Sequence, residues 1–511
     1  MEKEYLEWLN KCIKVCMKID LLDNEQKKLE FDYLDKTYVQ LVELQKQKIR
    51  DFLLFELSVD DYIYIASIII AYSKNKELKE MFLEYFLKMK YDCFQGAMIE
   101  IQILAKGNIN NYLFMRELHR KNVNLFKKSI DFKYEYIPIS EREKNRIVII
   151  TDTLISKYNA PTMIVLQYAY VLKKMLGYKV DICACPMNKK IEYNWYKPLY
   201  TNSPREKITP NKHFNIICED ISLDVYQFNM DIHGDREYKS LLRFIKTWRP
   251  LFVFELGVSN PIADVTRFIT TTVAMDVSIH LPISDADYLI KLADQPDEEK
   301  YITNYQKILS RGATQKYFET SGRIYDRIEF GFKNDDFLVA IVGNRLDMEI
   351  DKSFIEVLKK IQDDNENIMY LVIGECNILK DKFEQFGITH VCFMGERYDL
   401  METYSIIDLY VNPERSGGGY SGLMAATAGV PVVTMPNCDV AYNVGDDFVV
   451  NNYNEMIETV NKCIKDKDFY AEKKEMTKKI SEKNTKENMY QSICRELKKV
   501  INQIEMDLYN K

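Results

Sequence analysis

The sequence lacks the marks of a secreted or membrane-spanning protein. Its 11 cysteines follow no framework spacing, and its first residues, MEKEYLEWLNKC, do not show the charged-then-apolar pattern of a signal peptide. The most apolar run, Tyr62–Tyr72, is about half of the roughly 20 residues that a membrane span needs. These absences predict a soluble cytoplasmic protein with reduced thiols and no disulfide scaffold.

An excess of positive charge is also missing. The chain carries 70 Lys and Arg against 77 Asp and Glu, which gives a net charge of -7 and a pI near 5.6. The protein as a whole is therefore not expected to be drawn to nucleic acid or to anionic membranes.

Length and periodicity divide the chain into several parts. At 511 residues it is too long for one core, and a length of this size suggests roughly three domains. Residues 1–140 have few glycines or prolines and apolar residues at helical spacing, which predicts an all-α domain for docking an acceptor or partner. Two α/β domains are expected over 145–330 and 335–468, and an amphipathic helix within 469–511 is expected to pack back on the body.

Two strand-helix-strand series define the fold class. The run RIVIIT at 146–151 is a continuous β-branched strand, and a helical segment and the strand YKVDICA follow it. A second series opens with FLVAIVG at 337–343. This pattern predicts an α/β protein with two Rossmann-like domains of parallel sheet facing across a cleft.

A glycine-rich loop stands out in a chain with only 18 glycines. Gly417, Gly418 and Gly419 follow a buried strand and precede a small-residue helix. This arrangement gathers free backbone N–H groups and the positive end of a helix at one place, which is how folds hold phosphate. We therefore expect the loop to hold the diphosphate of a nucleotide-sugar.

Candidate donor-binding residues lie at the carboxyl ends of successive strands, where open parallel sheets bind ligands. Arg345 is expected to supply a cation to the diphosphate, although a surface ion pair with Asp347 or Glu349 is an equally ordinary role. Backbone at Gly395 and Glu396 is expected to contact a base edge. The full set is Gly343, Asn344, Arg345, Gly374, Glu375, Gly395, Glu396, Arg397, Ser416, Gly417, Gly418, Gly419, Tyr420, Ser421 and Gly422.

The order of these motifs resembles a known family. VGNRL, a strand ending in IGE, FMGERYDLMETYSIIDLYVNP and GGYSGLMAATAGVPVVTM together resemble the donor-binding domain of GT-B glycosyltransferases. GYSGLMAATAGVPVVTMP is similar to the O-GlcNAc transferase-like family, which includes bacterial adhesin glycosyltransferases, and NAPT at 159–162 resembles that family's motif after its first strand. The resemblance implies a bacterial enzyme that transfers GlcNAc or glucose from a UDP-sugar to a protein side chain, for example on a surface adhesin or flagellin. Asn159 and Thr162 would then lie on the acceptor side.

Departures from the family patterns leave two alternatives open. The retaining branch of GT-B enzymes has two spaced glutamates before a Gly-x-Pro turn, but these positions fall on Ser416 and Met424 here. In the O-GlcNAc transferase-like pattern, a common histidine becomes Ala160, and Glu349 lies near the place of an expected lysine. A retaining enzyme of polysaccharide or glycolipid synthesis and a non-catalytic homologue that assists a transferase therefore remain as alternatives.

The catalytic base is expected on the first α/β domain. His280 follows a strand and precedes a Leu-Pro pair, and Asp152 follows the first strand, so these two are the candidates. The Asp285-Ala286-Asp287 triplet matches a metal-binding motif of a different glycosyltransferase fold but lacks its strand context. We therefore expect no required metal and no cofactor besides the UDP-sugar co-substrate.

Overall fold

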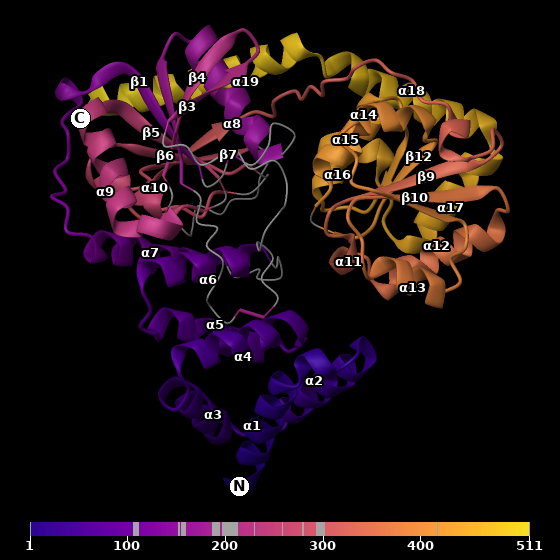
Figure 1. Cartoon of the computed structure of the whole chain (residues 1–511), viewed down its shortest axis with the longest axis horizontal. Coiled ribbons are helices and arrows are strands. Elements are labelled where there is room, and N and C mark those ends of the chain that lie inside the picture. The colour runs from indigo at the N-terminus through magenta and orange to yellow at the C-terminus, as the bar shows by residue number, and fades with distance from the viewer. Residues whose placement is uncertain are drawn as a thin grey trace. The chain divides into compact units, whose positions relative to one another are not determined.

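The chain folds into two compact units, residues 1–312 with 497–511 and residues 313–496. Their elements are labelled in Figure 1. The computed structural model describes residues 2–105, 112–151, 154, 160–185, 195–196, 213–228, 230–257, 259–277, 281–292, 302–415 and 417–509. None of the helices in these ranges is both long and apolar enough to cross a membrane.

The first unit begins with a helical region, as the apolar spacing predicts. Side-chain oxygens of Asp23, Ser58 and Asn75 accept backbone N–H groups and fix the start of three of its helices. The helices are α1 (Glu2–Met17), α2 (Asn24–Val39), α3 (Glu43–Phe55), α4 (Val59–Tyr72), α5 (Lys76–Lys88), α6 (Cys93–Ala105) and α7 (Tyr112–Ser129).

An α/β domain follows in the same unit, and its β-sheet has the strand order β3-β4-β2-β1-β5-β6-β7-β8. All neighbouring pairs are parallel except β3 and β4, which form an antiparallel hairpin at one edge. The strands are β1 (Glu143–Thr151), β2 (Lys179–Ala184), β3 (Phe214–Cys218), β4 (Ile221–Gln227), β5 (Pro250–Leu256), β6 (Thr272–Met275), β7 (Tyr288–Leu292) and β8 (Lys307–Arg311). Its helices are α8 (Ala160–Tyr170), α9 (Met230–Trp248) and α10 (Pro261–Val265).

The helical region shares an apolar core with this sheet. Val123 and Phe126 of α7 belong to the same buried cluster as Val148 and Ile150 of β1, together with residues of α6, α9 and α10. Helices α6 and α7 are therefore an integral part of the first unit, and the buried residues of α1–α5 form a second apolar cluster with these same two helices.

A buried polar cluster also joins α7 to the sheet domain. His119 Nδ1 lies 2.7 Å from Glu100 Oε1 of α6, and its Nε2 lies 2.5 Å from Asp264 Oδ2 of α10. Asn122 donates to Glu100, and Ser259 donates to the same carboxylate. The imidazole thus links three helices through both of its nitrogens.

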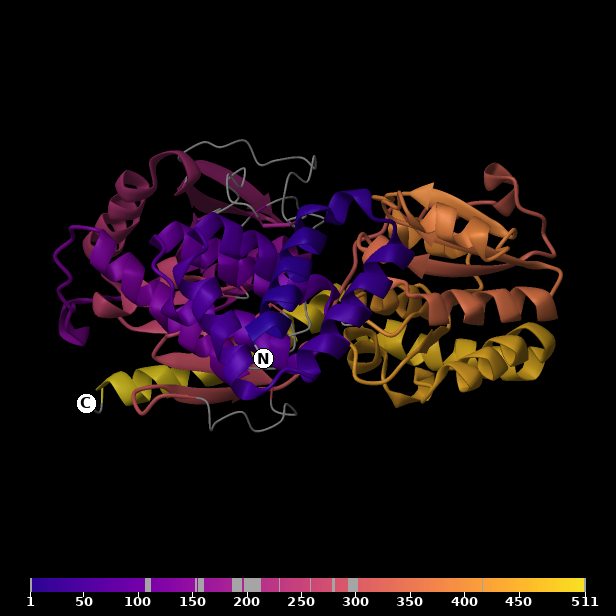
Figure 2. The same cartoon turned by 90° about the horizontal axis from the view of Figure 1, so that it is seen from below.

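The second unit contains a parallel sheet of order β11-β10-β9-β12-β13. Alternate residues of β9 face two different cores, with Val339 and Ile341 on one side and Leu338 and Ala340 on the other. Helices therefore cover both faces. Figure 2 shows this unit, coloured from orange to yellow, from a second direction. The strands are β9 (Phe337–Val342), β10 (Ile368–Ile373), β11 (Val391–Gly395), β12 (Leu409–Asn412) and β13 (Val432–Thr434).

The helices of this unit connect the parallel strands and continue into the C-terminal segment. Residues 469–511 contain the larger part of α18 and the whole of the last helix, α19, which begins in the second unit and ends in the first. The helices are α11 (Leu346–Glu349), α12 (Lys352–Asp364), α13 (Leu379–Gln385), α14 (Leu400–Thr403), α15 (Gly419–Thr427), α16 (Asp439–Val444), α17 (Tyr453–Lys465), α18 (Lys467–Lys483) and α19 (Lys486–Tyr509).

Candidate functional site

The candidate site lies where the strand order of the second sheet reverses. β9 is flanked by β10 on one side and by β12 on the other. The chain adds β10 and β11 on one side of β9, and then crosses to add β12 and β13 on the other side. Ligands of open α/β sheets bind at the carboxyl ends of the strands at such a switch point. The loops after β9 and after β12 are the two that carry Arg345 and the glycine run.

Main chain forms the base of this site. The N–H of Gly343 donates to Ile373 O at 2.9 Å, and the N–H of Gly374 donates to Gly395 O at 2.8 Å. A Cβ at Gly374 would lie 1.9 Å from Gly343 O, and its φ of +133° is one that other residues rarely adopt. The glycines predicted at three strand ends therefore come together as close-packed backbone.

The glycine loop ends in the N-terminus of α15. Gly418 has a φ of +88° and is the N-cap residue, so the first N–H groups of the helix lie directly after it. A Cβ at Gly417 would lie 2.7 Å from Arg345 Nη2, and one at Gly418 would lie 2.4 Å from Arg415 Nη2. Two guanidinium groups therefore pack against this loop, and their charge adds to the positive end of the helix.

Arg415 is a buried residue that the sequence analysis missed. Its side chain is 3% exposed and donates to Asn412 Oδ1, Glu349 Oε2 and Val342 O at 2.7–2.8 Å, with a longer contact of 3.2 Å to Tyr410 OH. Burial disfavours the charged guanidinium, but the neighbouring Tyr410 and Glu349 outweigh it and raise the pKa of Arg415. Arg415 therefore ties the ends of β9 and β12 to α11.

Arg345 is the more accessible of the two arginines. Its side chain is 46% exposed, and Nη2 lies 2.8 Å from Glu349 Oε1. The ion pair that the sequence left open is thus present with Glu349, whereas Asp347 accepts the N–H groups of 377–379 at the start of α13. These two guanidinium groups and the carboxylate of Glu349 together carry one net positive charge, and Asp439 of α16 also packs against the loop at Gly419.

The predicted residues of α15 differ in their surroundings. The Ser421 hydroxyl donates to Gly418 O at 2.9 Å and lies 3.0 Å from Tyr410 OH, so it stabilises the start of the helix. The Tyr420 ring packs edge-on against Phe318, with centroids 5.6 Å apart. A Cβ at Gly422 would lie 2.5 Å from Val440 Cγ1, which shows how closely α15 and α16 pack.

The remaining donor candidates lie at the ends of β9, β10 and β11. Asn344 and Glu375 are exposed directly after their strands. Glu396 accepts from Tyr398 OH at 3.4 Å. Arg397 pairs with Asp399 at 2.5 Å, and its guanidinium lies over the Phe330 ring, so its charge is engaged by these neighbours.

Most of the acceptor-side and catalytic candidates lie outside the described residues. These are Asp152, Asn159 and His280, and Ser416 of the donor-binding set lies outside them too. Thr162 is fully buried in α8. Their roles stay predictions. No group of three or more His, Cys, Asp or Glu within the described ranges is arranged to hold a metal ion.

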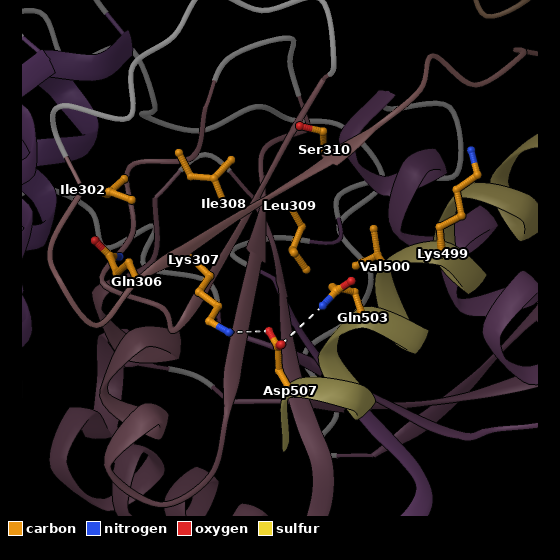
Figure 3. A pocket seen from close by; sticks show the side chains of 10 residues that line it. All are labelled: Ile302, Gln306, Lys307, Ile308, Leu309, Ser310, Lys499, Val500, Gln503 and Asp507. Atoms are coloured by element: carbon orange, nitrogen blue, oxygen red, sulfur yellow. Dashed lines mark hydrogen bonds and ion pairs between the residues drawn. The ribbon is translucent and has the colours of Figure 1, made fainter. Parts of the chain in front are cut away.

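A separate pocket lies in the first unit between the edge strand β8 and α19. Its volume is about 590 Å³, and Figure 3 shows Lys307 and Gln503 converging on Asp507 at one side of it. No residue predicted from the sequence lines it. Its lining consists of Ile302, Gln306, Lys307, Ile308, Leu309, Ser310, Lys499, Val500, Gln503 and Asp507.

Comparison with known proteins places a family match on the second unit. Residues 323–486 match the family model described as Glycosyl transferases group 1, which covers most of the second unit. No curated protein matches the sequence.

Solved structures resemble the chain in fold. An O-GlcNAc transferase mutant of Thermobaculum terrenum is 12% identical, with a TM-score of 0.58 over 99% of both chains. A glycosyltransferase from Rickettsia africae ESF-5 is also 12% identical, with a TM-score of 0.50 over 71% of this chain and 99% of that one. The predicted fold class, GT-B with an N-terminal all-α region, is confirmed.

Proposed function

We propose that this GT-B glycosyltransferase takes GlcNAc or glucose from a UDP-sugar and transfers it to a protein side chain. One observation carries the donor half of the proposal. At the switch point of the second sheet, the N-terminus of α15 and the half-exposed Arg345 lie together against a loop of glycines, so helix N–H groups and a cation meet at one place. Such a site suits a diphosphate.

The same groups suit the chemistry of transfer. When the bond from sugar to diphosphate breaks, negative charge grows on the leaving phosphate, and fixed donors aimed at it lower the barrier. Backbone N–H groups of α15 and the guanidinium of Arg345 supply these donors. The main chain at Gly395 and Glu396 lies at the end of β11, where we propose that it contacts the base.

A protein acceptor is supported by two features. The donor segment resembles the protein-modifying O-GlcNAc transferase-like branch, and the helical region offers a large additional surface that shares its core with the first α/β domain. We propose that His280 or Asp152 removes the acceptor proton and that neither metal nor cofactor takes part. Cytoplasmic transfer to an adhesin or flagellin fits this proposal.

Calorimetry with UDP tests the donor site. The wild-type protein should bind UDP, UDP-GlcNAc or UDP-glucose equally well with and without EDTA. Arg345→Ala should weaken UDP binding by about tenfold or more, since charge-assisted hydrogen bonds contribute about 1.5–3 kcal/mol. Arg323→Ala is the matched control because Arg323 forms an exposed ion pair with Glu329. Absence of binding to any of these nucleotides would refute the donor site.

Intact-mass measurement tests the transfer. Proteins co-expressed with the chain should gain a hexose or an N-acetylhexosamine, and His280→Ala or Asp152→Asn should stop the gain while leaving UDP binding intact. Sugar found in lipid or polysaccharide instead would support the retaining alternative. Binding without any turnover would support the non-catalytic homologue.

A further inference from the structure

We propose that Glu349 is a built-in anion that competes with the donor diphosphate for Arg345, and so limits how tightly the site holds phosphate ligands. The inference rests on the donor site proposed above. It concerns a carboxylate that lies between two cations at the place where the ligand's negative charge is expected.

The contacts of Glu349 are shared between the two arginines. Oε1 lies 2.8 Å from Arg345 Nη2, and Oε2 lies 2.7 Å from Arg415 Nη1. A Cβ built on Gly417 would lie 2.7 Å from the same Arg345 nitrogen and 3.3 Å from Glu349 Oε1. The ion pair therefore lies directly against the main chain of the glycine loop.

The two arginines that Glu349 contacts differ in how firmly they are held. Arg415 is buried, and it also donates to Asn412, Val342 O and Tyr410, so it cannot leave its position. Arg345 is half exposed, and Glu349 is its one ion-pair partner in the part of the chain that the structure describes. A ligand at the loop can therefore draw Arg345 away while Glu349 stays on Arg415.

A diphosphate is a stronger partner for Arg345 than Glu349 is, because it carries more negative charge. Glu349 offers Arg345 one negative charge in a position with partial access to water, where such pairs contribute little. A diphosphate offers a larger charge and several oxygens in the geometry that a guanidinium prefers. A diphosphate must break the ion pair between Arg345 and Glu349 before it can bind Arg345. Its affinity is therefore lower than it would be if Arg345 had no ion-pair partner.

Glu349→Gln is the informative change because it removes the charge and keeps an oxygen for Arg415. If Glu349 competes, UDP should bind more tightly, by up to about fivefold, the range expected for loss of a partly exposed ion pair. If Glu349 instead serves to orient Arg345, the same change should weaken binding. The direction of the effect separates the two roles.

The experiment is calorimetry with UDP and with uridine, which lacks phosphate. Wild type, Glu349→Gln, Arg345→Ala and the double variant are compared, with Glu356→Gln as control because Glu356 forms an exposed pair with Lys352 on α12. UDP affinity should rise in Glu349→Gln, uridine affinity should not change, and the gain should vanish in the double variant.

The calorimetry separates failure of the competition by Glu349 from failure of the proposed donor site. If wild type and the Glu356→Gln control bind no UDP, the proposed function fails. If both bind UDP while Glu349→Gln binds it no more tightly, the competition by Glu349 is refuted. Should Glu349→Gln fail to fold, Glu349→Asp replaces it: a carboxylate that is shorter by one methylene weakens the pair with Arg345, so it should also strengthen UDP binding.

Discussion

His119 holds its proton between two buried carboxylates. Burial alone would lower the pKa of the imidazole, but the charges of and hydrogen bonds to Glu100 and Asp264 outweigh this and raise the pKa well above 6.5. Both ring nitrogens lie within 2.7 Å of a carboxylate oxygen, so the imidazolium is the form that the site stabilises.

This raised pKa predicts a stability that depends on pH. A group whose pKa is higher in the folded than in the unfolded state contributes its full stabilisation below the unfolded value, near 6.5. The contribution is lost as the pH rises through the folded value, at most by about 1.4 kcal/mol per pH unit. Thermal unfolding of wild type between pH 6.5 and 9 should therefore show a decline that His119→Gln lacks.

His213→Gln is the control, since His213 lies half exposed on the hairpin edge of the first sheet. It should leave the pH dependence as in wild type. Equal slopes for wild type and His119→Gln would show that His119 does not take up a proton on folding.

Arg345 and Arg415 show how far residue patterns reach. Arg345 was predicted because it directly follows the Gly-Asn that ends a strand. Arg415 was not, because its acceptors come from β9, β12 and α11, which are 3 to 73 residues away in the chain. The position of Arg415, two residues before the glycine run, could have indicated a role in the loop. Only the folded structure shows which oxygen atoms accept hydrogen bonds from its guanidinium.

At the scale of elements, α15 and α16 control where the glycine loop lies. A Cβ on Gly422 would lie 2.5 Å from Val440 Cγ1 and 3.2 Å from its Cγ2. A larger residue at this position must push the two helices apart, and the N-terminus of α15 moves with its helix.

Gly422→Ala should therefore weaken UDP binding, by about threefold to tenfold if the helix shift removes one net hydrogen bond. Val440→Ala removes the two contacting methyl groups, so the double variant should regain most of the affinity. Calorimetry on the three proteins checks this. A double variant no better than Gly422→Ala would contradict a steric cause.

Strands were predicted well where runs of β-branched residues are buried on both sides. RIVIIT and FLVAIV correspond to β1 and β9, whose central residues are fully buried. β7 and β8 lie in a stretch whose sequence shows a weaker strand pattern. β8 is an edge strand with a mixed pattern of exposure, so its sequence does not carry the apolar signal of a central strand.

At the scale of the molecule, the shared core of the first unit predicts that the helical region cannot be removed. Deletion of residues 1–130 would expose Val148 and Ile150 of β1 and leave Asp264 without its imidazole partner. The shortened protein should be insoluble or bind the dye ANS, as proteins with exposed apolar surface do. A soluble product with the wild-type melting temperature would show instead that the region is an independent module.

Backbone alone forms the base of the candidate site in the second unit. Where Gly343, Gly374 and Gly395 meet, the wall is backbone, and mutation cannot alter a peptide group as it alters a side chain. Drift in sequence can change the loops and helix faces around this wall while the wall stays chemically the same. New sugar preferences in relatives should therefore arise from substitutions around the edge of the site, with this backbone wall inherited unchanged.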